Sequence, residues 1–427
     1  MAIKGSGSPM ETVDEYFDML IKSRFIEMFG TSTDPKYGLV KIRDLVSNTI
    51  EKVAKRYDSE DEIRYIDISS IDKESKSIIG TTDYYVKDAP SRAQQCVIKD
   101  DILLSNVRPN LKTLAIVNLE YDNLVCSTGF TVLRCKSACP EYLTTAITDE
   151  YFTDKLVKKA NGSNYPAVTS KDVLESYVPA ASIDLQKQYA SFVKQVDKSK
   201  AVCKQIFQSL DNLVKSRFIE MFGDPYLSPK YQKMPFMHCL DFNPGKSEVK
   251  NVPDDLMVSF VPMDSVGTDG SIDVSKEKTL GEVRKGYTYF RDNDVVFAKI
   301  TPCFENGKVS IAKKCRNGIG FGTTEFHVAR PKEGISNSTW LFYLLRSDSL
   351  RMLASGNMSG TAGQKRVQQP FFEKISIGLP PINEQESFAS FVKQVDKSKF
   401  EVVQSLLRLK SKYMRTETPS KRTDCDL

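Results

Sequence analysis

The side chains that most often perform acid–base or metal chemistry are scarce in this 427-residue chain. It contains two histidines, His238 and His327, and nine scattered cysteines without a Cys-x-x-Cys pair. Structural zinc sites need clustered Cys and His ligands, and catalysis near neutral pH most often uses histidine. We therefore expect no metal site and a buried, hydrogen-bonded His327. The cysteines are expected to be reduced thiols of a cytoplasmic protein, packed as small apolar side chains.

Motifs for nucleotide or methyl-transfer chemistry are incomplete. The chain has no Gly-x4-Gly-Lys-Ser/Thr loop for phosphate binding. The glycine-rich stretch 318–322 precedes an apparent strand, and we predict a hairpin turn there. Residues 243–246 lack the second proline and the aromatic residue of an adenine methyltransferase loop, and the acidic pair at 254–255 fits a turn. We therefore predict that the chain is not an enzyme.

An internal repeat determines the organisation of the chain. Residues 20–30 recur as 213–223 with one difference, and residues 190–200 recur unchanged as 389–399. The offsets are 193 residues (213 minus 20) and 199 residues (389 minus 190). Such offsets are far longer than the units of solenoid proteins. The repeat therefore indicates two domain-sized halves joined by near-identical connectors.

The connectors are predicted to be long helices. No Gly or Pro occurs from 186 to 222, and apolar side chains recur at alternating spacings of three and four, typical of a coiled coil. The predicted seam consists of Phe192, Val196, Ser199, Cys203, Ile206, Leu210 and Leu213. Partial copies predict an N-terminal helix ending near Phe29 and a C-terminal helix over 383–415. Antiparallel packing of these helices would give a pseudo-twofold arrangement.

The segments between the connectors diverge in sequence but share a skeleton. Short runs rich in Val, Ile, Phe and Tyr predict corresponding strands, within 64–68, 99–109 and 128–134 and within 259–263, 291–302 and 324–330. Helices are predicted near 141–159 and 339–354. The fold class is therefore α+β: two pseudo-symmetric mixed α/β domains joined by long antiparallel coiled-coil helices. The predicted boundaries are a flexible leader at 1–11, a connector helix at 12–30, a first domain at 31–183, a central helix at 184–223, a second domain at 224–382, a C-terminal helix at 383–415 and a disordered tail at 416–427.

This pattern resembles the specificity subunit of type I restriction-modification systems, over residues 12–415. The resemblance depends on the duplicated connector, the divergent domains and four local signatures: Asp101-Ile-Leu-Leu with Pro109, Asp294-Val-Val-Phe with Pro302, Leu379-Pro-Pro-Ile-Asn-Glu-Gln385, and a weaker form of the last at 178–186. It implies a non-catalytic subunit that recognises specific sequences in double-stranded DNA. Each domain would be a target recognition domain for half of a bipartite site, with a non-specific gap set by the helices.

The resemblance also implies partners. Two methylation (M) subunits and restriction (R) subunits would carry out adenine methylation and restriction. S-adenosylmethionine, ATP and Mg would bind to those partners, and this chain would hold no cofactor. The net charge of +5 permits a nucleic-acid partner without requiring one, and no apolar window is long enough to span a membrane. Two alternatives stay open: a coiled-coil scaffold or adaptor without DNA specificity, and the recognition half of a fused restriction-methylation enzyme.

A DNA-recognising domain needs Lys and Arg for phosphates, and Arg, Lys, Asn or Gln on loops that reach base edges. Two loops of the second half, 299–308 and 359–366, have this composition. Their counterparts in the first half are 106–112 and 161–166. The candidate DNA-contacting residues are Asn106, Arg108, Asn110, Lys112, Asn164, Tyr165, Lys299, Thr301, Asn306, Lys308, Gln364, Lys365 and Arg366.

Overall fold

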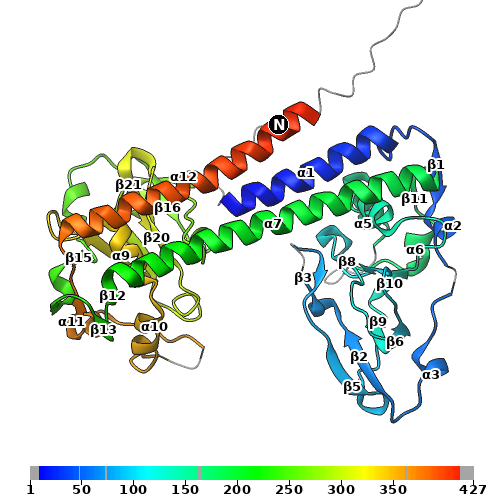
Figure 1. The fold of residues 1–427 in the computed structure, drawn as a ribbon, viewed down its shortest axis with the longest axis horizontal. Helices are drawn as coiled ribbons and strands as arrows, with labels where there is room; N and C mark the ends of the chain where they lie inside the picture. The colour runs from blue at the N-terminus through cyan, green and yellow to red at the C-terminus, as the bar shows by residue number, and fades with distance from the viewer. Residues whose placement is uncertain (1–8, 48, 73–74, 161–165, 361–362, 414–427) are drawn as a thin grey trace, which may run out of the picture. The chain divides into compact units, whose positions relative to one another are not determined.

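The computed structural model describes residues 9–47, 49–72, 75–160, 166–360 and 363–413, although the side chains of 9–12 and 406–413 are left out of the description. The chain divides into two compact units. The first unit is Tyr16–Lys200, and the second is Ala201–Leu427 together with Met1–Glu15. Helices α1 (Pro9–Phe29) and α7 (Ile183–Phe222) contribute residues to both (Figure 1).

The first unit contains mixed sheets and short helices. Strand β2 pairs in parallel with β9, and the sheet order is β5–β2–β9–β6. A second sheet has the order β10–β7–β8, and β1 pairs with β11 and β3 with β4. The elements are β1 (Leu39–Lys41), α2 (Ile42–Leu45), α3 (Val53–Arg56), β2 (Glu62–Ile66), β3 (Ile71–Asp72), β4 (Ser77–Ile78), β5 (Thr82–Tyr85), β6 (Ala93–Cys96), β7 (Ile102–Ser105), β8 (Leu114–Ile116), β9 (Leu124–Ser127), β10 (Phe130–Leu133), α4 (Pro140–Ile147), α5 (Glu150–Lys159), α6 (Ser170–Leu174) and β11 (Tyr177–Pro179).

The second unit repeats this topology. Strand β16 pairs in parallel with β21 in the order β17–β16–β21–β18, and the other large sheet has the order β15–β22–β19–β20. The elements are β12 (Gly223–Asp224), β13 (Ser228–Pro229), β14 (Lys233–Pro235), β15 (Leu240–Phe242), β16 (Met257–Val261), β17 (Glu277–Thr279), α8 (Leu280–Val283), β18 (Thr288–Arg291), β19 (Val295–Ala298), β20 (Val309–Ile311), β21 (Ile319–Gly322), β22 (Phe326–Pro331), α9 (Ser338–Leu345), α10 (Asp348–Ser355), α11 (Gln369–Lys374), β23 (Ser376–Gly378) and α12 (Ile382–Tyr413). The predicted α+β class is confirmed.

Two local predictions were wrong. The glycine-rich stretch 318–322 is mostly strand β21, and the turn precedes it at Arg316–Gly318, where Asn317 and Gly318 have positive φ. Gly320 leaves room for the ring of Phe290, whose nearest atom would lie 2.1 Å from an added Cβ. These glycines therefore permit close packing inside a sheet.

Each predicted domain helix is instead a pair of helices. In the second unit Ser347 lies between α9 and α10, and its hydroxyl accepts a hydrogen bond from the backbone N–H of Leu350. Ser347 is therefore the N-cap of α10, so a new helix begins there. In the first unit α4 ends at Ile147. The hydroxyl of Thr148 donates to the backbone carbonyls of Thr144 and Thr145.

The connector helices pack in the same antiparallel way in each unit. In the first unit, Tyr189 of α7 packs edge-on against Phe25 and Phe29 of α1. In the second, Phe388 of α12 packs edge-on against Phe218 and Phe222 of α7. These residues are related by the two offsets of the repeat. An ion pair follows the same relation, Lys200 with Asp18 and Lys399 with Asp211.

The buried seam of α7 departs from the predicted one in the C-terminal half of the helix. Val196 and Cys203 are buried as predicted, but Phe207 and Val214 are buried where Ile206 and Leu213 were expected. Ile206 and Leu213 are instead 39% and 49% exposed. After Cys203 the next buried position is Phe207, four residues on, and Val214 follows seven residues later. The seam of this half therefore lies one residue later in the sequence than predicted.

Helix bounds also differ slightly from the prediction at the chain ends. Helix α1 begins at Pro9, within the stretch predicted as a leader, and the described part of α12 ends at Tyr413. Residues 1–8 and the predicted tail lie outside the described residues.

Candidate nucleic-acid interface

The structure brings the two candidate loops of the second half together. Where β19 ends, the backbone N–H of Thr301 donates to the carbonyl of Lys365 at 2.9 Å, and the N–H of Val367 donates to the carbonyl of Lys299 at 2.9 Å. The Thr301 hydroxyl also accepts a hydrogen bond from the Lys365 N–H at 3.0 Å. The loops therefore form one surface element, although they are more than 50 residues apart in the sequence.

The first unit contains the same backbone frame. The N–H of Arg108 donates to the carbonyl of Pro166 at 2.8 Å, and the N–H of Val168 donates to the carbonyl of Asn106 at 2.9 Å. In both units the frame is fixed to the residue before the paired strand, β10 or β22, because Asn106 N–H donates to Gly129 O and Lys299 N–H to Glu325 O, each at 2.9 Å. Equivalent loops therefore meet in equivalent positions of the two units.

Several candidate residues have exposed side chains. Arg108 and Asn110 lie around the short 3-10 helix Pro109–Leu111, and Asn306 is exposed in the corresponding loop of the second unit. Gln364 and Lys365 are exposed beside that loop. Arg108 and the half-buried Lys112 flank the 3-10 helix in left-handed backbone conformation, with φ of 52° and 50°. Asn164 and Tyr165 lie outside the described residues.

Other candidates make contacts within the protein. The side-chain Oδ1 of Asn106 accepts a hydrogen bond from the Thr131 hydroxyl at 2.6 Å, and Lys308 Nζ donates to the Met263 backbone carbonyl at 2.9 Å. The Lys299 side chain is half-buried. Thr301 uses its hydroxyl to hold the neighbouring loop. The side chains of these residues therefore help to hold the loops in place.

Arg366 forms an ion pair with a residue that sequence reasoning missed. Its Nε and Nη2 donate to the Glu325 carboxylate, each with a contact of 2.9 Å, and its Nη1 donates to the Gln364 carbonyl at 3.0 Å. The guanidinium beside Glu325 lowers the pKa of that carboxyl and opposes the effect of burial. The two residues are 41 positions apart, and only the Phe326 strand that follows Glu325 was recognisable in the sequence.

His327 fixes the base of the same loop and is buried, as predicted. Its Nε2 lies 2.9 Å from the Val367 carbonyl, and its Nδ1 lies 3.1 Å from the Asn243 amide nitrogen. The carbonyl can only accept, so Nε2 carries the hydrogen and Nδ1 accepts from the amide. Burial lowers the pKa of His327 to about 4, so the ring is neutral at neutral pH.

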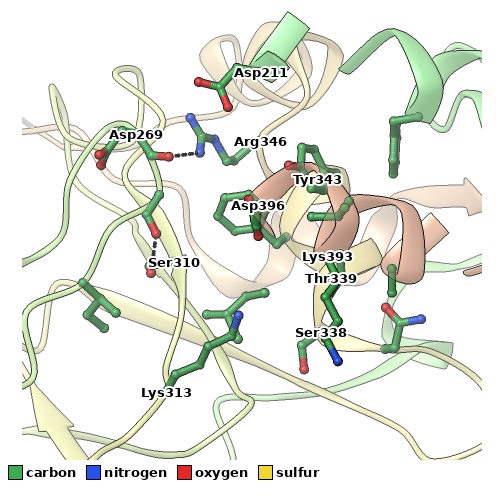
Figure 2. Close-up of a pocket in the computed structure, with 18 of the residues that line it drawn as sticks. Asp211, Asp269, Ser310, Lys313, Ser338, Thr339, Tyr343, Arg346, Lys393 and Asp396 are labelled. Atoms are coloured by element: carbon green, nitrogen blue, oxygen red, sulfur yellow. Dashed lines mark hydrogen bonds between the residues drawn. The ribbon is translucent and has the colours of Figure 1, made fainter. Parts of the chain in front are cut away.

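A pocket of about 1570 Å³ lies in the second unit, and none of the candidate loop residues lines it. Figure 2 shows part of its lining. Its lining includes acidic and basic side chains of α7, α10 and α12, together with Arg346 directly after α9. Arg346 donates to the backbone carbonyls of Asp269 and Thr268, at 2.9 and 2.6 Å. Burial raises the pKa of the Asp396 carboxyl in this pocket. The mixture of charges gives the pocket no single preferred ligand charge.

The described residues contain no cluster of three or more His, Cys, Asp or Glu that could hold a metal ion. Within the same part of the chain, no helix has the length and apolar character needed to cross a membrane.

Comparison with known proteins identifies the second half of the chain. Residues 244–408 match the family model described as the type I restriction modification DNA specificity domain. This region is similar to the DNA specificity domains of type I restriction-modification systems. It includes the ends of β19 and β22 and the loops that meet beside them.

Similar proteins agree with this assignment. The chain is 44% identical over 140 residues to the EcoEI specificity subunit and 46% identical over 135 residues to the EcoAI specificity subunit, both of type I restriction enzymes from Escherichia coli. These matches cover 32% and 31% of this chain. They span 23% of the length of each relative. The predicted resemblance to type I specificity subunits is therefore confirmed.

A solved structure shares the fold over most of the chain. The structure, titled for complex assembly and conformational transition of the type I R-M system, matches with a TM-score of 0.50 and 20% identity. The match covers 88% of this chain and 94% of that one. At this identity the similarity establishes the shared fold.

Proposed function

We propose that this chain is the DNA-recognition subunit of a type I restriction-modification complex. Each unit acts as a target recognition domain that binds one half of a bipartite site in double-stranded DNA. The helices set the non-specific gap between the halves. The chain directs adenine methylation and restriction without carrying out either reaction.

The observation that carries this proposal is the shared backbone frame of the paired loops. A duplicated frame with different side chains suits two domains that bind DNA in the same way but recognise different bases. Exposed Arg, Asn, Gln and Lys side chains on these loops have the hydrogen-bonding groups that base edges and phosphates require. On this basis Arg108, Asn110, Asn306, Gln364 and Lys365 are the proposed DNA-contacting residues.

Further proposed contacts surround these five residues. Lys112, Lys299 and Lys308 border the loops as half-buried cations, and Asn164 and Tyr165 belong to the first unit's second loop by sequence alone. Asn106 and Thr301 hold the loops together through their side chains. For Arg366 we propose a role that depends on its ion pair with Glu325, as described below.

The proposed partners follow from the resemblance and from the specificity domain. Two methylation subunits supply S-adenosylmethionine-dependent methyl transfer, and restriction subunits supply ATP-dependent cleavage with Mg. Adenine must leave the base stack to reach a methylation site, and a separate subunit can provide that pocket. The specificity chain then needs only to position the partners on the correct sequence.

Methylome sequencing of cells that express this chain with its methylation subunit tests the proposal. The expected result is one methylated motif consisting of two short specific sequences separated by a gap of fixed length. A coiled-coil scaffold would produce no motif that depends on this chain. A fused enzyme fragment would be revealed if the purified chain methylated DNA without a partner.

A further inference from the structure

The ion pair between Glu325 and Arg366 occurs in only one of the two otherwise equivalent loop frames. Lys299 N–H donates to Glu325 O in the second unit, as Asn106 N–H donates to Gly129 O in the first. Arg366 pairs with Ile300 by a backbone bridge, as Ala167 pairs with Val107. The first unit therefore has Gly129 and Ala167 at these positions, and neither can form an ion pair.

The Arg366 side chain uses three of its five N–H donors within the protein, two of them in the ion pair. Nε and Nη2 contact the Glu325 carboxylate, and Nη1 donates to the Gln364 carbonyl. The side chains of Arg366 and Glu325 are only 30% and 26% exposed, so solvent screens the pair incompletely. Arginine–carboxylate pairs with this two-point geometry are among the stronger charge-assisted hydrogen bonds.

An arginine without the ion pair at this position would increase the affinity for DNA of any sequence. Arginine binds phosphate through the same fork of N–H groups that here binds a carboxylate. Each phosphate contact adds sequence-independent affinity and steepens the dependence of binding on salt. Specificity is a difference between affinities, so an added contact lowers discrimination when it strengthens binding to non-specific DNA more than binding to the motif.

We propose that Glu325 is a specificity-determining residue of the second recognition domain because it withholds Arg366 from the DNA backbone. This inference rests on the proposed function. Arg366 then acts as a positioning residue: its Nη1 holds the Gln364 carbonyl, and its backbone bridges to both Ile300 and Ser359. The adjacent Gln364 and Lys365 keep exposed side chains for DNA.

The test compares full-length chains assembled with the methylation subunit. The probes are a duplex carrying the methylated motif and the same duplex with its half-site bases shuffled, each titrated over a range of salt concentrations. For Glu325→Gln, shuffled-duplex affinity should rise severalfold. Its log–log salt slope should steepen by about 0.9, the effect of one added phosphate contact. The affinity for the motif should rise less, because base contacts already fix the docking there, so the preference for the motif should fall. An equal rise for both duplexes would overturn the assignment of Glu325 to specificity.

Two further variants separate this mechanism from a general change of charge. Glu325→Gln combined with Arg366→Gln should return the shuffled-duplex salt slope to the wild-type value, because the released cation is gone. Glu305→Gln removes a carboxylate from an exposed position of the neighbouring loop and should leave the slope within about 0.3 of the wild type. If Glu325→Gln folds poorly, Arg366→Gln alone provides the test: the salt slope should keep the wild-type value, and a slope shallower by about 0.9 would show that Arg366 already contacts phosphate in the wild type.

Distinct outcomes would overturn the inference. Unchanged affinity and slope for Glu325→Gln would show that Arg366 is not withheld from phosphate. A selective gain for the motif alone would show that the released arginine contacts a base. If the wild-type complex itself showed no preference for the motif, the proposed function would fail instead, whatever the variants did.

Discussion

Arg330 donates from Nε and Nη2 to the two carboxylate oxygens of Asp294, and each contact is 2.8 Å long. The side chains are 8% and 1% exposed. In the first unit Arg134 donates in the same way to Asp101, at 2.9 and 2.7 Å. The carboxylate precedes the strand that ends at the candidate loop, and the arginine lies near the end of the strand paired with it: Arg330 within β22 and Arg134 directly after β10. The ion pair therefore fixes the scaffold on which each loop frame is built.

Removing the Asp294 carboxylate should destabilise the second unit strongly. Asp294→Ala leaves the buried Arg330 with only the Glu248 carboxylate as an ionic partner, and breaking a buried pair typically costs about 3–5 kcal/mol. Chemical denaturation would measure the loss in free energy of unfolding.

The control is Asp348→Ala, because Asp348 is 91% exposed and pairs with Arg351 at the surface. Its replacement should cost less than about 1 kcal/mol. Equal losses for the two variants would contradict the structural role assigned to Asp294.

The neutral, buried His327 should make the second unit sensitive to mild acid. Its pKa is about 4 in the folded chain, against about 6.5 when unfolded. Below pH 6.5 the unfolded state therefore takes up a proton that the folded state refuses. Stability should fall as pH decreases from 6.5 to 4, by about 3 kcal/mol in total.

The variant His327→Gln removes this titration while keeping a donor for the Val367 carbonyl. The free energy of unfolding of wild type minus that of the variant should decrease between pH 6.5 and 4. His238 is exposed, and His238→Gln should keep the wild-type profile. A difference that stays constant across this range would exclude His327 as the source of the acid sensitivity.

In the 359–366 loop of the second unit, Gln364 should contact a base and Lys365 should contact a phosphate. Gln364→Ala should reduce affinity by about 1–3 kcal/mol and relax one base position of one half-site. Lys365→Ala should weaken binding to all sequences and reduce the salt slope by about 1. Binding titrations of the assembled complex, with single-base variants of the motif, measure both effects. Wild-type affinity and slope in both variants would remove this loop from the interface.

Helix length should determine the gap between the half-sites. One heptad inserted between Ala201 and Leu210 of α7, with a matching heptad in α12, keeps the apolar seam in phase. It adds about 10 Å at 1.5 Å per residue, which corresponds to about 3 base pairs at 3.4 Å each. Methylome sequencing should detect unchanged half-sites and a gap about 3 base pairs longer. The original gap in a stable, active variant would show that another feature sets the spacing.

The sequence predicted the parts of this fold that depend on local pattern. The repeated connectors lack Gly and Pro, so their helices could be recognised, and the strand before Pro302 was visible as a short apolar run. The seam at Phe207 was missed because its choice over Ile206 depends on which helix packs alongside. Glu325 was missed for a similar reason: nothing near it in the sequence indicates a partner such as Arg366, which approaches only when the two loops meet.

The central claim is that each unit recognises one half-site independently, and a domain replacement tests it most directly. Residues 31–180 are replaced with the corresponding recognition domain of another specificity subunit, and the methylome is sequenced in cells that supply the methylation partner. One half-site should change, while the other half-site and the gap should be retained. A change in both half-sites would contradict the claim that the two units recognise DNA separately.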